Sequence, residues 1–177
     1  MATVLLALAI ISTGLYAGFM LTFRTGVMPA LAQLTDEQFL AAMRRINEVV
    51  PRPLFVLTFF SIVVFPAVAL AVPTEGRTTE QTWLIVAGLV CSVLNHLVTI
   101  GGNIPLNNAL AAAERSAGTG TAAPRTSGAG GGRSADWSAL SDKEVRTAFE
   151  GPWNRLHLIR TLFTIAAFAL LVAAALG

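Results

Sequence analysis

The sequence predicts an all-α protein: an integral membrane four-helix bundle with an amphipathic helix in its first loop and a flexible, glycine-rich third loop. Of the 177 residues, 54% are hydrophobic and 12% charged, with a mean hydropathy of +0.66, whereas soluble domains carry roughly 25% charged residues. Four apolar runs approach the ~20 residues that a helix needs to cross a bilayer. We expect one transmembrane domain over 1–177, with spans at about 3–23, 53–72, 82–100 and 156–176.

The basic residues predict how the chain is oriented. Lys and Arg collect in cytoplasmic loops, and all of them except Arg77 lie in or beside the first and third loops or at the start of the last span. Loops one and three are therefore expected in the cytoplasm and both termini outside, in a plasma membrane of bacterial type. The lipid bilayer is the expected partner. No basic surface interleaved with aromatic residues points to nucleic acid, and association with further copies of the chain stays open.

The first apolar run is interpreted as a retained helix, because no Lys or Arg precedes it and it exceeds the usual length of a signal-peptide core. Small residues in its middle, such as Gly14 and Gly18, favour close packing of helices in lipid. The Tyr16 hydroxyl is expected either to bond a neighbouring helix or to point into an internal site. Arg24 follows at the cytoplasmic end, as an interface anchor or as a substrate-binding residue.

The first loop has the signature of a helix start at Thr35, with Gln38 three residues on and acidic residues between them. Apolar residues then recur every three or four positions, so one face of this helix is expected on the membrane surface or on the bundle. Glu48 lies beside that face. It is interpreted as a solvated partner of Arg44 or Arg45, with substrate binding as the alternative.

The second span contains Pro66, which predicts a kink, and the third ends in an unusually polar stretch. His96, Thr99, Asn103 and Asn107 follow at spacings of three and four, which places them on one face if the helix continues. Pro105 is expected to bend the chain there. Together with Asn108, these groups suit the mouth of a pocket better than a packing seam, because a buried polar group without a partner costs about 1–3 kcal/mol.

The segment 117–136 is rich in Gly, Ala, Ser and Thr, so a flexible linker or lid is predicted. Ser141 and Glu144 form a capping box that opens a short helix, which Gly151 and Pro152 are expected to break. The last span then carries a polar face composed of Trp153, His157, Arg160 and Thr164.

Arg160 is the sharpest signal in the chain. It lies about two turns inside the fourth apolar run, where an unpaired charge costs at least ~2.5–3.5 kcal/mol. It is expected to face a partner or a polar cavity, with snorkelling to the boundary as the alternative. The predicted topology brings the unusual polar groups to the cytoplasmic end of the bundle, so one cytoplasm-facing pocket accounts for them. An inter-helix polar network without a ligand would use the same residues.

No metal site is expected, because the sequence has no local ligand motif. His96 and His157, with Glu48 to complete the set, are the alternative ligands that the topology leaves open. A glycine-rich phosphate loop, a dinucleotide fingerprint and a GxSxG elbow are all absent.

Four segments of the chain carry a family resemblance: VMPAL at 27–31, the pair Ile46–Asn47, NIPLNNAL at 103–110 and WNRLHLIR at 153–160. With these segments the chain resembles the anthrone-oxygenase-like group of small four-helix membrane proteins. The resemblance covers nearly the whole chain, and 117–135 looks like an insertion.

The resemblance implies oxygenation of an anthrone or a similar electron-rich polycyclic phenol to a quinone with O₂, in aromatic polyketide tailoring, with no cofactor beyond O₂. A hydrophobic aromatic small molecule is then the substrate. In such a reaction His157 or His96 is the expected base, Arg160, Asn103 and Asn107 the donors that stabilise the anion, and Trp153 an aromatic wall. The alternative is a non-enzymatic accessory or transport protein whose polar groups only hold the helices together.

Overall fold

The structure is a computed structural model that describes residues 2–119, 137 and 139–177. Four of its helices are long and apolar enough to cross a membrane, so the prediction of an all-helical integral membrane bundle is confirmed. The predicted flexible segment lies outside the described residues, apart from 117–119, which end a helix. The elements are α1 (Ala2–Thr22), η1 (Phe23–Val27), α2 (Met28–Leu31), α3 (Asp36–Val49), α4 (Pro53–Ala71), α5 (Thr79–Val98), η2 (Thr99–Asn103), α6 (Ile104–Thr119) and α7 (Asp142–Leu176).

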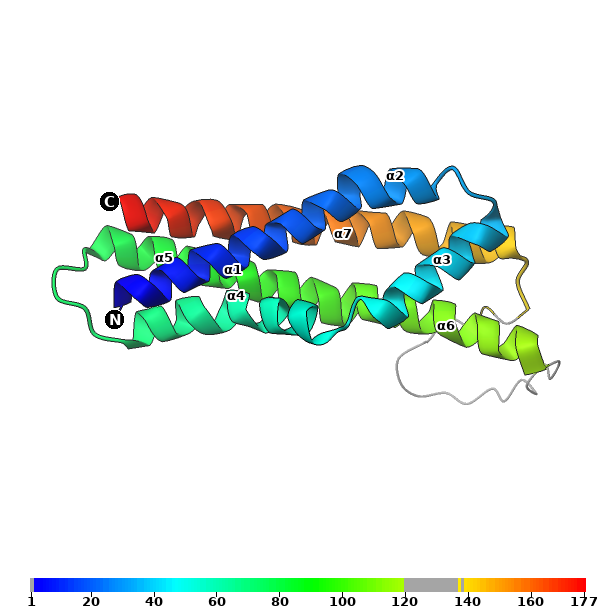
Figure 1. Cartoon of the computed structure of the whole chain (residues 1–177), viewed down its shortest axis with the longest axis horizontal. Coiled ribbons are helices and arrows are strands. Elements are labelled where there is room, and N and C mark those ends of the chain that lie inside the picture. The colour runs from blue at the N-terminus through cyan, green and yellow to red at the C-terminus, as the bar shows by residue number, and fades with distance from the viewer. Residues whose placement is uncertain (1, 120–136, 138) are drawn as a thin grey trace.

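Three of the four spans are longer than their apolar runs. Thr3–Leu31, Thr79–Glu114 and Asp142–Leu176 each continue beyond the predicted boundary. At 1.5 Å per residue α7 is about 50 Å long, whereas the hydrocarbon core is ~30 Å thick. Both chain termini lie at one end of the bundle, which we call the termini end, and the excess length extends toward α3 at the other, the α3 end (Figure 1).

Two short π-helices, η1 and η2, join the apolar spans to their extensions. Each is followed by one residue and then a proline, Pro29 after η1 and Pro105 after η2. In both, the wider turn is closed by a bond across five residues: Met28 N–H to the Phe23 carbonyl, and Ile104 N–H to the Thr99 carbonyl. A proline inside a helix lacks a donor and crowds the preceding turn. The π turns let the helices continue through both prolines, including Pro105, where the sequence suggests a bend.

The predicted break at Gly151 and Pro152 is wrong, because α7 is continuous from Asp142 to Leu176. Phe149 and Trp153 flank these two residues and are both buried in one hydrophobic cluster. Packing on the two sides of the proline therefore offsets the missing hydrogen bond. The capping box of Ser141 and Glu144 is confirmed at the start of the helix.

The predicted amphipathic helix is α3, capped by Thr35 with Gln38 as its partner. It packs on the bundle and buries Phe39, Leu40 and Met43 against α6 and α7. Arg146 of α7 ties it down by donating to Asp36 at 3.0 Å and to the carbonyl oxygen of Leu34 at 2.9 Å. The α3 end therefore has its own hydrophobic core, to which Met28, Leu110, Val145, Phe149 and Trp153 also belong.

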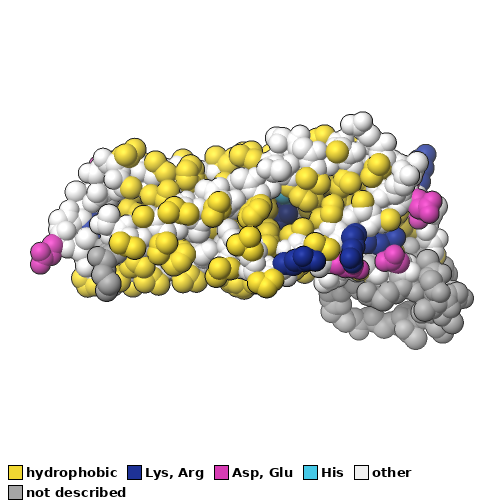
Figure 2. Space-filling view, in the orientation of Figure 1, with side chains coloured by type: hydrophobic (Ala, Val, Ile, Leu, Met, Phe, Trp, Pro, Cys, Tyr) yellow, Lys and Arg dark blue, Asp and Glu magenta, His cyan; other side chains and the backbone are white. Residues whose placement is uncertain are grey.

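Within the spans, α7 packs between α1 and α5, and α4 packs on α1 and α5. The outward faces are apolar, and Figure 2 shows hydrophobic side chains covering the half of the bundle near the termini end, while most charged side chains on that face gather toward the α3 end. At Gly88, α5 packs closely on α7. A Cβ added there would lie 3.1 Å from Leu171 Cγ.

Substituting Gly88→Val is expected to lower the free energy of unfolding by about 1–3 kcal/mol, because the added atoms would force α5 and α7 apart. Thermal unfolding of the purified protein in detergent measures this change. Gly18→Val is the matched control, since a Cβ at Gly18 meets no atom within 4 Å. Equal losses in both variants would contradict the assigned packing.

Candidate functional site

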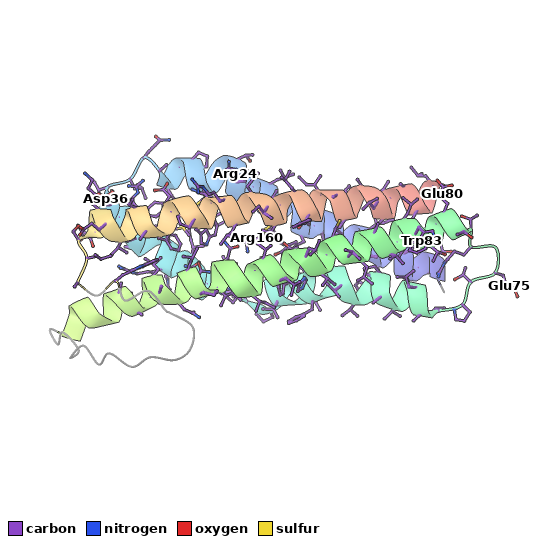
Figure 3. The ribbon with its side chains drawn as sticks, turned by 180° about the vertical axis from the view of Figure 1, so that it is seen from behind. Arg24, Asp36, Glu75, Glu80, Trp83 and Arg160 are labelled. Atoms are coloured by element: carbon purple, nitrogen blue, oxygen red, sulfur yellow. The ribbon has the colours of Figure 1, made fainter. Side chains whose placement is uncertain are left out.

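A cluster of buried polar side chains lies between α1, α5 and α7, near the middle of the long axis, where Figure 3 labels Arg160. α5 and η2 supply one stripe, in which polar residues recur every four positions; α7 supplies the stripe predicted from its spacing; α1 supplies a tyrosine. The buried members are Tyr16, Asn95, Thr99, Asn103, Trp153, His157, Arg160 and Thr164.

Arg160 is buried to 8% exposure, and none of the ion pairs among the described residues involves it. Its guanidinium instead donates to His157 Nδ1, from Nε at 3.2 Å and from Nη2 at 2.9 Å. His157 Nε2 lies 3.0 Å from the carbonyl oxygen of Met20 in α1. A guanidinium only donates and a carbonyl only accepts. His157 is therefore neutral, with its proton on Nε2, and it links α1 to Arg160.

Trp153 covers this pair. Its ring stacks on His157 with the centroids 4.8 Å apart, and the Arg160 guanidinium carbon lies 5.5 Å from the ring centroid. The indole N–H donates to Asn107 Oδ1 at 2.9 Å, while Asn103 Nδ2 donates to the Trp153 carbonyl at 3.4 Å. The predicted donors Asn103 and Asn107 thus both hold Trp153, which explains why the polar stretch after the third span lies against the start of the fourth.

Tyr16 and Asn95 contribute polar groups that have no partner. The Tyr16 hydroxyl is fully buried beside Asn95, Thr99 and Arg160, yet it makes no hydrogen bond of ordinary geometry. Asn95 accepts a 3.4 Å bond from the Thr164 hydroxyl, and its Nδ2 has no acceptor. A buried donor without an acceptor costs about 1–3 kcal/mol, so these atoms are available to a ligand.

His96 lies on a different face of α5 from the stripe. Its Nδ1 is 2.8 Å from the Ser92 carbonyl and must donate to it, so Nε2 carries a lone pair in the neutral ring. That Nε2 atom is buried and has no partner. The ring stacks on Phe59 of α4 at 3.9 Å, and the Tyr16 ring packs on the same phenylalanine at 6.0 Å.

Three of the predicted site residues stand apart from the cluster. Asn108 is exposed, and Glu48 accepts a 2.9 Å bond from Arg45 on the exposed face of α3, as the solvated-partner interpretation predicted. Arg24 is half-buried and close enough for its charge to act on His157. The alternative metal site does not form. His96, His157 and Glu48 make no three-ligand group, and no other such group occurs among the described His, Cys, Asp and Glu residues.

The predicted cytoplasm-facing pocket is not an open mouth, because the hydrophobic core of the α3 end fills that region in the part of the chain that the structure describes. A cavity of about 340 Å³ lies instead at the termini end, between the first turns of α1, the last turns of α7 and the loop at Thr74–Arg77. Figure 2 shows a hollow in the apolar face, with basic and histidine side chains visible at its base.

Asn95 and Phe59 were not among the candidate residues named from the sequence, and Thr164 was named only as part of the polar face of the last span. Asn95 and Thr164 are polar residues inside apolar runs, and the four-residue spacing of Asn95, Thr99 and Asn103 was the signal for the first. Phe59 had no signal, since it is one of several aromatic residues in an apolar span.

Replacing His157 by Phe is expected to cost about 1–3 kcal/mol of unfolding free energy, because it leaves the Arg160 donors buried without their acceptor. The double variant His157→Phe with Arg160→Met should recover most of that loss, since both partners are then apolar. Denaturant titration of these two variants and of Arg160→Met alone, in mixed micelles, gives the coupling between the two side chains. Additive losses in the double variant would contradict the assigned pairing.

Comparison with known proteins identifies the family of the chain. A family profile described as Anthrone oxygenase matches residues 39–170, which include α3, all of the last three spans up to the final turns and the cluster residues except Tyr16. No curated protein and no solved structure matches the chain. Because the match covers well over half of the sequence, this four-helix membrane protein belongs to the anthrone oxygenase family.

Proposed function

We propose that this protein is a membrane oxygenase that converts an anthrone, or a similar electron-rich polycyclic phenol, to the quinone with O₂ and no further cofactor. The family match supports oxygenase chemistry, and the polar cluster supports a substrate that becomes an anion. The substrate is a hydrophobic aromatic small molecule, of the kind made in aromatic polyketide tailoring.

The proposal rests mainly on one observation: Arg160 is buried and has no carboxylate partner among the described residues. A guanidinium buried among apolar helices without a carboxylate costs several kcal/mol unless something compensates its charge. Its one hydrogen-bonding partner in the described chain is the neutral ring of His157. An enolate or phenolate oxygen would supply the missing negative charge, and the stabilisation would grow as the substrate loses its proton.

His96 is the general base in this proposal. A base needs a free lone pair that is held in direction. His96 Nε2 has no partner, and the bond from Nδ1 to the Ser92 carbonyl fixes the ring. His157 lacks such a lone pair, because Arg160 occupies its Nδ1 and its Nε2 proton points to Met20. His157 is thus a positioning residue for Arg160.

The chemistry balances with O₂ alone. His96 takes one proton from the ring methylene, and the carbanion passes an electron to O₂. Superoxide and the carbon radical then combine, the peroxide takes up a proton, and loss of water leaves a carbonyl. The net change is CH₂ + O₂ → C=O + H₂O. The Tyr16 hydroxyl and the Asn95 Nδ2 group are donors for the developing oxyanion, since neither donor makes a hydrogen bond of ordinary geometry among the described residues.

His96→Gln is expected to lower kcat at least 10²-fold, because general base catalysis contributes about 10²–10⁴. The assay is oxygen uptake and quinone absorbance with a panel of hydroxylated anthrones and the purified protein in lipid vesicles. Cys91→Ser on the same helix is the control and should retain wild-type rates. An absence of both O₂ uptake and product across the panel would overturn the proposed function, while full activity in His96→Gln would overturn its assigned base.

Tyr16→Phe separates the enzyme from a purely structural network. The hydroxyl lies beside Asn95 and Thr99 but makes no hydrogen bond of ordinary geometry, so its removal should leave the melting temperature nearly unchanged. Turnover should fall about 10–100-fold, because one oxyanion donor is lost. A variant that melts earlier but turns over normally would instead support the non-enzymatic alternative, in which the polar groups only hold helices together.

A further inference from the structure

The polar cluster lacks a described opening at the α3 end. Trp153 lies directly over His157 and belongs to the hydrophobic core there, together with Phe39, Leu40 and Phe149. A planar molecule would have to displace this core to reach Arg160 from that direction. The other approach is from the side, through the face of the bundle that lies against lipid.

The hollow in Figure 2 lies where α1 and α4 diverge. In the same orientation, Figure 1 shows α1 and η1 on one side of it and the junction of α3 with α4 on the other. α1 packs along α4, whereas η1 packs on α1, α2 and α7, with no comparable contact to α4. The two walls therefore separate where α1 passes into η1, and α7 forms the base.

Aromatic rings line both walls at this level. Phe19 of α1 and Phe55 of α4 meet across the seam with centroids 6.3 Å apart, and Phe55 packs on Tyr16 at 5.8 Å. Phe55 is stacked parallel to Phe59 at 6.4 Å, and Phe59 in turn covers His96. The rings therefore form a continuous path from the lipid-facing surface, where Phe19 is 42% exposed, to the unpartnered groups inside.

We infer that the planar polycyclic substrate enters laterally from the bilayer between α1 and α4, and that Phe55 sets how many fused rings can pass. The inference rests on the proposed function. The chemistry of such a substrate fits both ends of this path. Its apolar rings match the aromatic side chains and the exposed Leu15, Leu54 and Leu57. Its oxygen anion matches the guanidinium of Arg160. Phe55 is the narrow point, because it contacts both the outer ring, Phe19, and the inner one, Tyr16.

The test compares Phe55→Ala with Phe55→Trp in vesicles that contain a three-ring or a four-ring hydroxyanthrone. The wider Ala variant should raise kcat/KM for the four-ring substrate relative to the three-ring one by about tenfold, and the Trp variant should lower that ratio similarly, since a pocket discriminates ring-sized groups by at least this factor. The change in the ratio should come mainly from KM, expressed as mole fraction in the lipid, rather than from kcat.

Phe65→Ala is the matched control. Phe65 lies on the same helix, but it packs on the cluster of Ala9, Ile85 and Leu171 at the termini end. Its truncation should reduce stability without changing the ratio. A ratio that moves in the same direction in both Phe55 variants, or that stays at the wild-type value, would overturn the inference.

A binding arm keeps this outcome separate from the proposed function. Dihydroxyanthraquinone and its four-ring counterpart carry the same phenolic oxygens but need no turnover, and their fluorescence reports binding in the same vesicles. Suppose that no anthrone is oxidised, but that Phe55→Ala raises and Phe55→Trp lowers the binding of the four-ring quinone relative to the three-ring one. The lateral path then holds and the oxygenase proposal fails. If anthrones are oxidised and neither assay shows these opposite shifts in the two Phe55 variants, the oxygenase proposal holds and the lateral path fails.

Discussion

The structure depends on a positive charge placed inside an apolar bundle. Arg160 cannot be left in such a site without cost, and the chain surrounds it with groups that lower that cost only in part: the lone pair of His157, the face of Trp153 and the dipoles of nearby hydroxyl groups. Each of these groups is itself held from another helix. His157 is anchored to α1 through Met20, and Trp153 is anchored to α6 through Asn107. The guanidinium thus explains why three helices converge at one depth.

Packing and polarity divide the molecule into two parts with different roles. The core of the α3 end is apolar and tightly closed, with Arg146 of α7 fixing the start of α3 through the Asp36 carboxylate and the carbonyl oxygens of Leu34 and Ala32. The polar cluster lies between that core and the apolar spans. The side-chain atoms of this cluster that lack a hydrogen-bond partner are the Tyr16 hydroxyl, Asn95 Nδ2 and Asn103 Oδ1. The unfavourable free energy of these unpartnered atoms is offset by the apolar surface buried in the helices on both sides of the cluster.

Much of this could be predicted from the sequence, because the strongest signals are local. Hydropathy located the four spans, the capping boxes at Thr35 and Ser141 located helix starts, and the spacing of Trp153, His157 and Arg160 gave their shared face. The continuity of α7 through Pro152 could not be predicted, since it depends on how Phe149 and Trp153 pack. The different states of the two histidines were also hidden: each depends on an acceptor or donor that only the three-dimensional arrangement supplies, as Arg160 and the Ser92 carbonyl show.

The π turns have a consequence for how the chain tolerates change. A π turn contains one residue more than the α turn it replaces, so deleting a single residue within Thr99–Asn103 would restore ordinary α geometry. The helix beyond it would keep its orientation relative to α5, because the wider turn already takes up the extra residue within about one revolution. If all five residues were instead wound as α-helix, everything beyond them would rotate by about 100°, so Asn107 would turn away from Trp153 and Leu110 would leave the core of the α3 end. The π turn therefore keeps the membrane half and the α3 half in register despite the extra residue, and its width matters more than the identity of its residues.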